Sequence, residues 1–315
     1  MTASGGTDSR VKVLFIAGWG RSGSTIMSSL LDQLGGFLSV GEAITWDRNV
    51  LQNRLCACSA PIRDCPFWQE MAGDYLNVSV AELEAIMEHR RSFRTRHLGR
   101  LLTERGRKRI ELDTREYREF LGGLYRQLRD RGGYRVLIDS SKFATHGYVL
   151  SLMDDIDLYV LHMVRDPRAV VHSWGSPKIY EVTGEGPRRM GGRGSLDSSV
   201  RWLAFNAVVE LLWGRRHGRY MRIRYEDFTR QPRETLLQIG AMVGERIDLG
   251  FFTSPTRARF KPSHIMGGNP SRYRSGEVDI VGDETWKRDM PRIRRWLATG
   301  VTLPLMVRYG YPSPG

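Results

Sequence analysis

The sequence predicts an α/β fold in which a central parallel sheet carries helices on both faces. Short β-branched apolar runs alternate along the chain with segments of helical periodicity, and this alternation is typical of parallel sheets. A chain of 315 residues with 41% hydrophobic content is long enough to bury a large core. We expect one domain, residues 1–315, in which the polar, Gly/Ser-rich residues 1–10 are disordered.

The first strand, loop and helix form the clearest unit. Val11–Ala17 (VKVLFIA) is a β-branched apolar run that ends at a glycine, and Ser24–Leu34 then carries apolar residues at helical spacing. Because strands alternating with helices return in parallel, later runs of this type should join the same sheet. Three such runs are each followed by a helical pattern: Arg135–Asp139, Leu158–Val164 and Tyr220–Tyr225.

A helical insertion at residues 80–131 separates the first strand, Val11–Ala17, from the second, Arg135–Asp139. Within it, residues 90–109 carry nine Arg or Lys against one acid, Glu104. We interpret this charge as a solvated helix face, and docking of an anionic acceptor or partner is the alternative. The glycine-rich, basic residues 184–195 predict a mobile loop that closes over a ligand. Residues 198–217 predict a long helix whose apolar side chains belong to the core.

The net charge of +13, from 48 Lys and Arg against 35 Asp and Glu, indicates an acidic partner. Nucleic acid, an anionic lipid or glycan, and a polyanionic cofactor all satisfy this charge. No run approaches the roughly eighteen apolar residues of a membrane span, and the N-terminus lacks the apolar core of a signal peptide. We therefore expect a cytoplasmic protein without a membrane span.

Three cysteines, Cys56, Cys58 and Cys65, lie within ten residues of one another. They do not form a disulfide framework for a chain of this size. A zinc site would need a fourth ligand, and the nearest histidine in the sequence is His89. A zinc site, a local redox or structural pair and plain structural cysteines all stay open, and the last is favoured; we assign no metal ligands.

The loop after the first strand, GWGRSGSTIM at residues 18–27, is almost a phosphate-binding loop. In the frame G-x-x-x-x-G-K-[ST], Ser24 stands where ATP- and GTP-binding proteins have a lysine. The loop nevertheless offers backbone amides at a helix start, hydroxyl groups and one arginine, which together favour an anion. The residues expected to hold that anion are Arg21, Ser22, Gly23, Ser24 and Thr25.

A second anion site is predicted where the strand ending at Val164 meets a helix. Pro167 has the position of a first helical residue, and Ser173 lies two turns further on. Arg165 and Ser173 could then hold an anion at the carboxyl edge of the sheet, where open α/β folds bind ligands. The alternative is that Arg165 only pairs with Asp166 or another acid.

Three motifs in this order resemble the sulfotransferases that use 3′-phosphoadenosine 5′-phosphosulfate (PAPS). They are RSGST after the first strand, VRDPRAVVHS with its arginine and serine eight residues apart, and IRYEDF at residues 223–228. The segment RYRSG at residues 272–276, followed by Trp286, extends the resemblance. It implies a P-loop-like sulfotransferase fold with a helical insertion, most similar in motifs to the carbohydrate, tyrosylprotein and bacterial branches.

The resemblance also implies roles for the donor-binding residues. Residues 21–25 would hold the 5′-phosphosulfate, Arg165 and Ser173 the 3′-phosphate, and Tyr225 would lie near the adenosine. The C-terminal spacing departs from the family pattern, so either Arg272 or Arg274 would contact the 3′-phosphate. PAPS has no γ-phosphate and its transfer needs no metal, which explains the missing lysine, and the product would be PAP.

For the chemistry, Glu42 after Gly41 resembles the Gly-Glu pair that supplies the base in tyrosylprotein sulfotransferases. Arg21 would stabilise charge on the bridging oxygen, and Lys142 would be a second cation. Ser140 or Ser141 is a candidate donor beside Lys142, whereas we expect His146 on a helix surface. The acceptor would carry a hydroxyl and be a carbohydrate, a lipid or a bacterial secondary metabolite.

Two other functions remain alternatives to sulfation. A nucleotide kinase or NTPase would use the same strand, loop and helix, but no lysine follows Gly23. A non-catalytic, basic nucleotide- or nucleic-acid-binding protein would explain the charge, but the sequence lacks a regular basic and aromatic platform. We therefore predict a PAPS-dependent sulfotransferase that does not bind nucleic acid.

Overall fold

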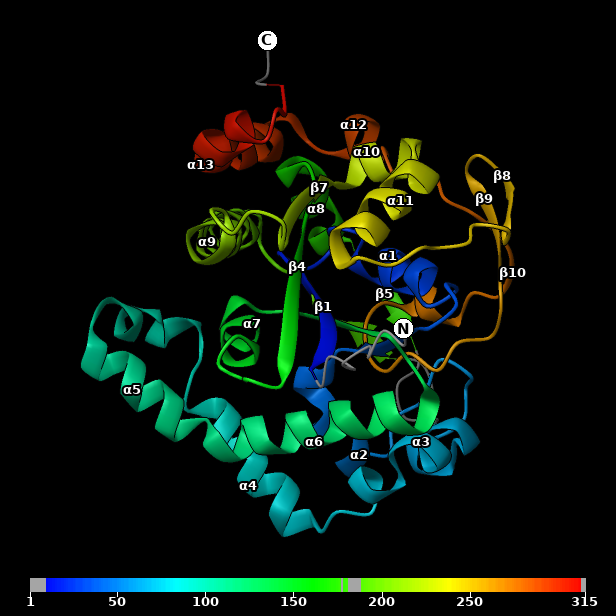
Figure 1. The fold of residues 1–315 in the computed structure, drawn as a ribbon. Helices are drawn as coiled ribbons and strands as arrows, with labels where there is room; N and C mark the ends of the chain where they lie inside the picture. The colour runs from blue at the N-terminus through cyan, green and yellow to red at the C-terminus, as the bar shows by residue number, and fades with distance from the viewer. Residues whose placement is uncertain (1–9, 177, 181–187, 313–315) are drawn as a thin grey trace, which may run out of the picture.

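A computed structural model describes residues 10–176, 178–180 and 188–312 (Figure 1). Its centre is a parallel sheet of five strands in the order β2-β3-β1-β4-β7. The four strands predicted from the sequence are present, and the edge strand β2 is an addition. The strands are β1 (Val11–Ala17), β2 (Phe37–Gly41), β3 (Val136–Lys142), β4 (Ile156–Val164) and β7 (Tyr220–Arg224).

The central strand β1 is apolar along its length because both of its faces are covered. It lies between β3 and β4, and all of its residues except Lys12 are buried. Phe15 packs with helices on one face, whereas Leu14 and Ile16 pack with helices on the other. This confirms the predicted arrangement of helices on both faces of a parallel sheet.

The two helical layers come from different parts of the chain. On the face of Phe15 lie α6 (Arg115–Gly132), α7 (Ala144–Leu150) and α9 (Ser195–Trp213), and on the opposite face lie α1 (Ser24–Leu31) and α11 (Pro232–Val243). The predicted helix at residues 198–217 is therefore present, but it begins three residues earlier, at Ser195, and ends four residues earlier, at Trp213. Two more helices flank α9: α8 (Pro167–Gly175) and α13 (Arg292–Arg308).

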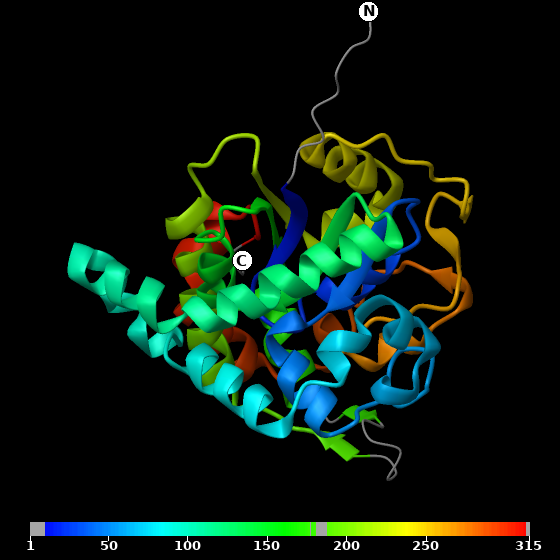
Figure 2. The ribbon, with the colours of Figure 1, turned by 60° about the horizontal axis from the view of Figure 1, so that its bottom comes forward.

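Residues 80–131 form the predicted helical insertion, but its helices differ in burial. The last of them, α6, buries Leu121, Leu124 and Leu128 and packs across the sheet, as Figure 2 shows. Only Ile110 of α5 is buried, so the expected solvated helix face applies to this part. The other elements of the insertion are α4 (Val80–Arg91), η3 (Thr95–Leu102) and α5 (Glu104–Asp113).

Between β2 and the insertion, the chain makes a compact region of short elements beside the sheet edge. They are η1 (Ala43–Thr45), α2 (Trp46–Leu51), η2 (Ile62–Asp64) and α3 (Pro66–Leu76). Trp46 and Trp68 are fully buried here with their ring planes at 84° to each other, so this region shares the core of the first face.

The C-terminal third adds a small antiparallel sheet that the sequence did not predict. Its strands pair in the order β10-β9-β8, and it packs on the same face as α1 and α11. The remaining elements are α10 (Tyr225–Arg230), β8 (Phe252–Ser254), β9 (Arg257–Phe260), η4 (Pro270–Tyr273), β10 (Gly276–Asp279) and α12 (Trp286–Asp289).

Parts of two predicted segments lie outside the described residues, namely 1–9 of the expected disordered N-terminus and 184–187 of the expected mobile loop. Where the loop is described it is partly ordered, because β6 (Arg188–Met190) pairs with β5 (Lys178–Tyr180). Among the residues that the structure describes, no helix is both long and apolar enough to cross a membrane.

Candidate active site

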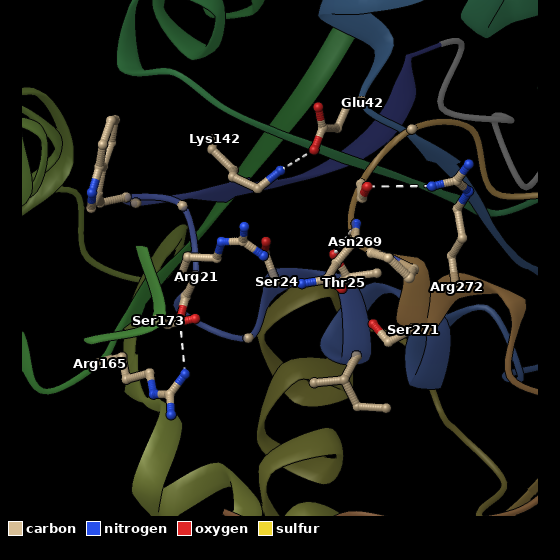
Figure 3. A pocket seen from close by; sticks show the side chains of 18 of the residues that line it. Arg21, Ser24, Thr25, Glu42, Lys142, Arg165, Ser173, Asn269, Ser271 and Arg272 are labelled. Carbon is tan, nitrogen blue, oxygen red and sulfur yellow. Dashed lines mark hydrogen bonds and ion pairs between the residues drawn. The ribbon is translucent and has the colours of Figure 1, made fainter. Parts of the chain in front are cut away.

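A cavity of about 860 Å³ opens at the carboxyl edge of the parallel sheet (Figure 3). Parallel strands bring their carboxyl ends to one edge, so the segments that follow β1, β2, β3 and β4 meet there. The volume lies within the range of small-molecule sites. The predicted residues that line the cavity are Arg21, Gly23, Ser24, Thr25, Glu42, Lys142, Arg165, Ser173, Tyr225, Arg272 and Arg274.

The turn into α1 forms an anion cradle, by which we mean the backbone amides of Gly23, Ser24 and Thr25. Gly23 caps the helix with φ +87°, a left-handed conformation that glycine adopts without strain. A β-carbon there would lie 2.4 Å from Cδ2 of the Tyr225 ring. Because first-turn amides have no partner within the helix and the helix dipole is positive there, the anion cradle favours negative charge.

The side chains of the loop support this cradle unequally. Thr25 Oγ1 accepts a hydrogen bond of 3.2 Å from the amide of Asn269, so its own proton can point toward a ligand. The guanidinium of Arg21 lies 4.8 Å from the centre of the Trp174 ring. Ser22 is 1% exposed, has no hydrogen-bond partner for its Oγ among the described residues and does not line the cavity. Its predicted contact with the donor therefore lacks support from its position.

Arg165 joins the second anion site to the first. Its guanidinium donates to the carbonyl oxygens of Arg21, at 3.2 Å, and Asp283, at 2.8 Å. It also pairs with the Asp283 carboxylate at 3.3 Å and lies 4.4 Å from the centre of the Tyr225 ring. Of the expected alternatives, the pair with Asp166 is wrong, because Asp166 pairs with Arg168 at 2.6 Å, but the pair with another acid is present, with Asp283.

The pairing of Arg165 with Asp283 sets the charge at this end of the cavity. Burial alone would raise the pKa of Asp283, but hydrogen bonds from Thr285 and the charge of Arg165 lower it below its usual value. The carboxylate is 47% exposed, whereas the arginine is 7% exposed. An anion that approached Arg165 would therefore meet a solvent-facing carboxylate that it could displace.

Glu42 and Lys142 form an ion pair at the other end of the cavity. Lys142 Nζ donates to the Glu42 carboxylate and, at 3.0 Å, to the carbonyl oxygen of Ser140. Lys142 ends β3 with φ +69°, next to an irregularity in its pairing with β1, and this bend aims its side chain toward Glu42. Both side chains remain partly exposed to the cavity, at 17% for Lys142 and 22% for Glu42.

The backbone geometry explains why a glycine precedes Glu42. Gly41 has φ +74°, and a β-carbon there would lie 1.9 Å from the carbonyl oxygen of Met266. That same carbonyl accepts a hydrogen bond of 2.9 Å from the amide of Glu42. The Gly-Glu pair thus lets the segment at Met266 approach closely and fixes the backbone of Glu42.

The structure corrects the predicted surroundings of Lys142. His146 is 2% exposed rather than on the surface, because its helix, α7, packs against β3. The Nε2 atom of His146 lies 2.6 Å from the Asp139 carboxylate. Burial would raise the pKa of Asp139, but the charge and hydrogen bond of His146 lower it. Ser141 also donates to Asp139, and neither it nor Ser140 lines the cavity.

The two C-terminal arginines occupy different surroundings. Arg272 is 4% exposed and donates to the carbonyl oxygens of Gly268, at 3.3 Å, and Leu55, at 3.4 Å. In Figure 3 it lies on the opposite side of Thr25 from Arg165. Arg274 is exposed and lines the same cavity. Arg272 therefore has a role in holding two backbone segments, which Arg274 does not share.

Sequence reasoning missed several residues of the cavity wall. Trp174, directly after Ser173, and Arg193, in the predicted mobile loop, face each other with the guanidinium 5.0 Å from the ring centre. Residues 267–269 line the wall beside Glu42, and their Gly-Gly-Asn sequence was the one available signal. No residue of the insertion at 80–131, all of which the structure describes, lines the cavity.

The cavity is strongly cationic. Among the residues that the structure describes, three acidic ones line it, namely Glu42, Asp279 and Asp283, so a ligand with several negative charges is favoured. The eight basic residues of the described lining are Arg21, Arg48, Arg54, Lys142, Arg165, Arg193, Arg272 and Arg274.

Comparison with known proteins identifies the type of fold. The profile of the Sulfotransferase family matches residues 14–248. The chain is similar to the sulfotransferase domain from the curacin biosynthetic pathway, with 16% identity, a TM-score of 0.55 and coverage of 96% of this chain and 99% of that one. It also resembles the sulfotransferase domain of the Synechococcus PCC 7002 olefin synthase, with 20% identity, a TM-score of 0.47 and coverage of 97% and 96%.

A third solved structure, sulfotransferase STF9 from Mycobacterium avium, has 13% identity and a TM-score of 0.48, covering 97% of this chain and 78% of that one. No curated protein sequence matches the chain.

Proposed function

The chain belongs to the Sulfotransferase family, and we propose that it moves a sulfuryl group from PAPS to a hydroxyl group of an acceptor and releases PAP. One observation carries this proposal. A single cationic cavity holds the anion cradle, the buried Arg165 and the Glu42–Lys142 ion pair. Those three features match the needs of a donor with two anionic ends and of an acceptor that must lose a proton.

The donor would span the cavity between its two anion sites. The anion cradle and Arg21 would bind the 5′-phosphosulfate, and Arg165 with Ser173 would bind the 3′-phosphate. Arg165 and Arg21 are already joined by a hydrogen bond of 3.2 Å, which couples the two sites. Since Tyr225 lies beneath the guanidinium of Arg165, its ring edge would border the adenosine.

The residues fit such a donor without a phosphate-loop lysine. Ser24 occupies the lysine position, and the cavity has no γ-phosphate to hold if the donor is PAPS. Both C-terminal arginines, Arg272 and Arg274, line the cavity and are candidates for a donor phosphate. Asp283 would give up its pairing with Arg165 as the 3′-phosphate binds.

In the proposed transfer, the bond between sulfur and the bridging phosphate oxygen breaks while the acceptor oxygen bonds to sulfur in line. Glu42 takes the acceptor proton, and Arg21 with Lys142 stabilises the charge that develops on the bridging oxygen. Lys142 holds Glu42 in place before the donor binds. It would then turn from the carboxylate toward the sulfonate, which leaves Glu42 able to accept the proton.

The acceptor would enter beside Glu42, in the part of the cavity lined by α2. Arg48 and Arg54 line this part, so a carbohydrate, lipid or secondary metabolite that carries an anionic group is favoured. We propose the cytoplasm as the place of the reaction. No observation favours a nucleotide kinase or a nucleic-acid-binding protein over this function.

Binding and transfer together test the proposal. Calorimetry should show that PAP binds at least about tenfold more tightly than 5′-AMP, because only PAP fills the site at Arg165. Labelled PAPS with a panel of hydroxyl acceptors should give a labelled product. Stabilisation by ATP with Mg²⁺ but not by PAP would instead favour a kinase.

A further inference from the structure

Three cysteines and one histidine meet beside the cavity wall, outside the proposed reaction. The sulfur atoms of Cys56, Cys58 and Cys65 and one ring nitrogen of His264 all lie within 4.8 Å of one another. His264 lies 199 residues after Cys65, so the fold supplies a candidate fourth ligand that is not near the cysteines in the sequence. We propose that these four side chains bind a structural zinc ion.

Four of the six distances among the ligand atoms match tetrahedral zinc rather than a disulfide. Cys65 Sγ lies 3.6 Å from Cys58 Sγ and 3.8 Å from Cys56 Sγ. His264 Nδ1 lies 3.3 Å from Cys65 Sγ and 3.7 Å from Cys56 Sγ. With Zn–S near 2.3 Å and Zn–N near 2.0 Å, tetrahedral geometry requires about 3.8 Å between sulfurs and about 3.5 Å between sulfur and nitrogen. A disulfide would need about 2.05 Å between sulfurs.

The donor set selects the metal. Three thiolates and one imidazole in tetrahedral arrangement are a structural zinc set, with no position left for water. An iron–sulfur cluster would insert iron and sulfide between the thiolates and would hold their sulfurs much further apart. The observed spacing therefore fits one ion in the middle of the four ligands.

The backbone positions the ligands independently of a metal. A tight turn after Cys56 returns Cys58 toward it, with Ser59 N donating to the Cys56 carbonyl at 2.9 Å. Cys65 precedes α3 at its N-cap, where the helix dipole favours a thiolate. The His264 ring stacks on Phe67 with ring centres 4.4 Å apart and planes at 10°, which fixes the direction of Nδ1.

Burial also distinguishes this cluster from a chance group of surface side chains. Cys56 and Cys65 are 0% exposed, and Cys58 is half-buried. Trp68, which is fully buried, donates from Nε1 to the carbonyl of His264 at 2.8 Å and so fixes the segment that carries the fourth ligand. Three thiols and an imidazole packed this closely have few other partners, and a metal ion would satisfy all four.

The ion would fasten two distant segments that build the cavity. His264 is two residues before Met266, whose carbonyl holds the amide of Glu42, and Leu55, next to Cys56, accepts a hydrogen bond from Arg272. The zinc would thus position the wall around Glu42 without touching the reacting atoms. The metal site itself does not depend on the proposed sulfuryl transfer.

Metal analysis of the untagged, full-length protein tests the inference. We expect about one zinc per chain, a zinc absorption-edge spectrum that fits three sulfurs and one nitrogen, and visible bands of tetrahedral cobalt after replacement by Co²⁺. Zinc below ~0.1 per chain would overturn the inference. So would an intact mass that shows a disulfide between two of the cysteines.

Variants add a specific readout. His264→Asn and Cys58→Ser should lose most of the zinc, and the matched control His217→Asn, which changes an exposed histidine, should keep it. Full zinc in both cluster variants, or equal loss in the control, would contradict the site. If the cluster variants do not fold, the absorption-edge and cobalt spectra of the unaltered protein decide the question alone.

Discussion

Substitution of Gly23 by alanine should damage both the fold and the donor site. Gly23 has φ +87°, and a β-carbon would lie 2.4 Å from one atom and 2.9 Å from another of the Tyr225 ring. Either the ring moves or the loop moves. Since Tyr225 is 8% exposed and lies under Arg165, both movements disturb the cavity.

The expected magnitude combines two costs. The left-handed conformation costs an alanine about 1–2 kcal/mol relative to glycine. Forcing a methyl group against a buried ring costs about 1–3 kcal/mol. The free energy of unfolding should therefore fall by roughly 2–5 kcal/mol. Loss of one or two charge-assisted hydrogen bonds from the anion cradle, at about 1.5–3 kcal/mol each, should weaken PAP binding by at least tenfold.

Urea unfolding and calorimetry with PAP measure the two effects. Gly35→Ala is the matched control, because a β-carbon at Gly35 meets no atom within 4 Å and its backbone is not left-handed. It should change the free energy of unfolding by less than about 1 kcal/mol. The reasoning would be refuted if Gly23→Ala matched this control in stability and bound PAP within about twofold of the parent.

Three further predictions concern the base, the second anion site and a buried histidine. Glu42→Gln should lower kcat by about 10²–10⁴-fold with little change in PAP affinity, whereas the control Glu234→Gln, at an exposed residue, should leave kcat unchanged. If kcat of Glu42→Gln stays within a few-fold of the parent, Glu42 is not the base. Arg165→Gln should weaken PAP about 10–100-fold and 5′-AMP by a clearly smaller factor, which reflects the lost hydrogen bond to the Arg21 carbonyl. Equal weakening of both nucleotides would count against the 3′-phosphate site. Burial lowers the pKa of His162 from 6.5 in the unfolded chain to about 4 in the folded protein. As the pH drops from about 6.5 toward 4, the unfolded chain therefore binds a proton that the folded protein does not, and the free energy of unfolding falls. Between pH 7.5 and 5 the His162 imidazole should lower the free energy of unfolding by about 2 kcal/mol. Urea titrations at both pH values would measure this loss, which should be absent in His162→Gln.

The sequence predicted the elements whose signals are local. Val11–Ala17 is a continuous β-branched run, and the following loop and helix carry their own glycine and periodicity, so the strand was predicted with both boundaries and the helix with its start at Ser24. The helix ends at Leu31, three residues before the predicted Leu34. The edge strand Phe37–Gly41 was missed because five residues with a serine and a glycine carry little periodicity. Its stability comes from pairing with β3, which no local pattern shows.

The site residues that could be predicted from the sequence were likewise those in local motifs, whereas those that depend on tertiary packing were missed or misplaced. Arg21, Glu42 and Arg165 belong to short motifs at strand ends, and topology then brings them to one cavity. His146 was misplaced because its burial depends on Asp139 and on the packing of α7. The partnership of His264 with three cysteines about two hundred residues earlier could not be read from spacing, since only tertiary packing creates it.

A crystal structure with bound PAP tests the central claim most directly. We expect the 5′-phosphate on the amides of Gly23, Ser24 and Thr25, the 3′-phosphate on Arg165 and Ser173, and Asp283 turned away from Arg165. A nucleotide bound elsewhere, or one whose two phosphates leave Arg21 and Arg165 without contact, would contradict the claim that this cavity holds the sulfuryl donor.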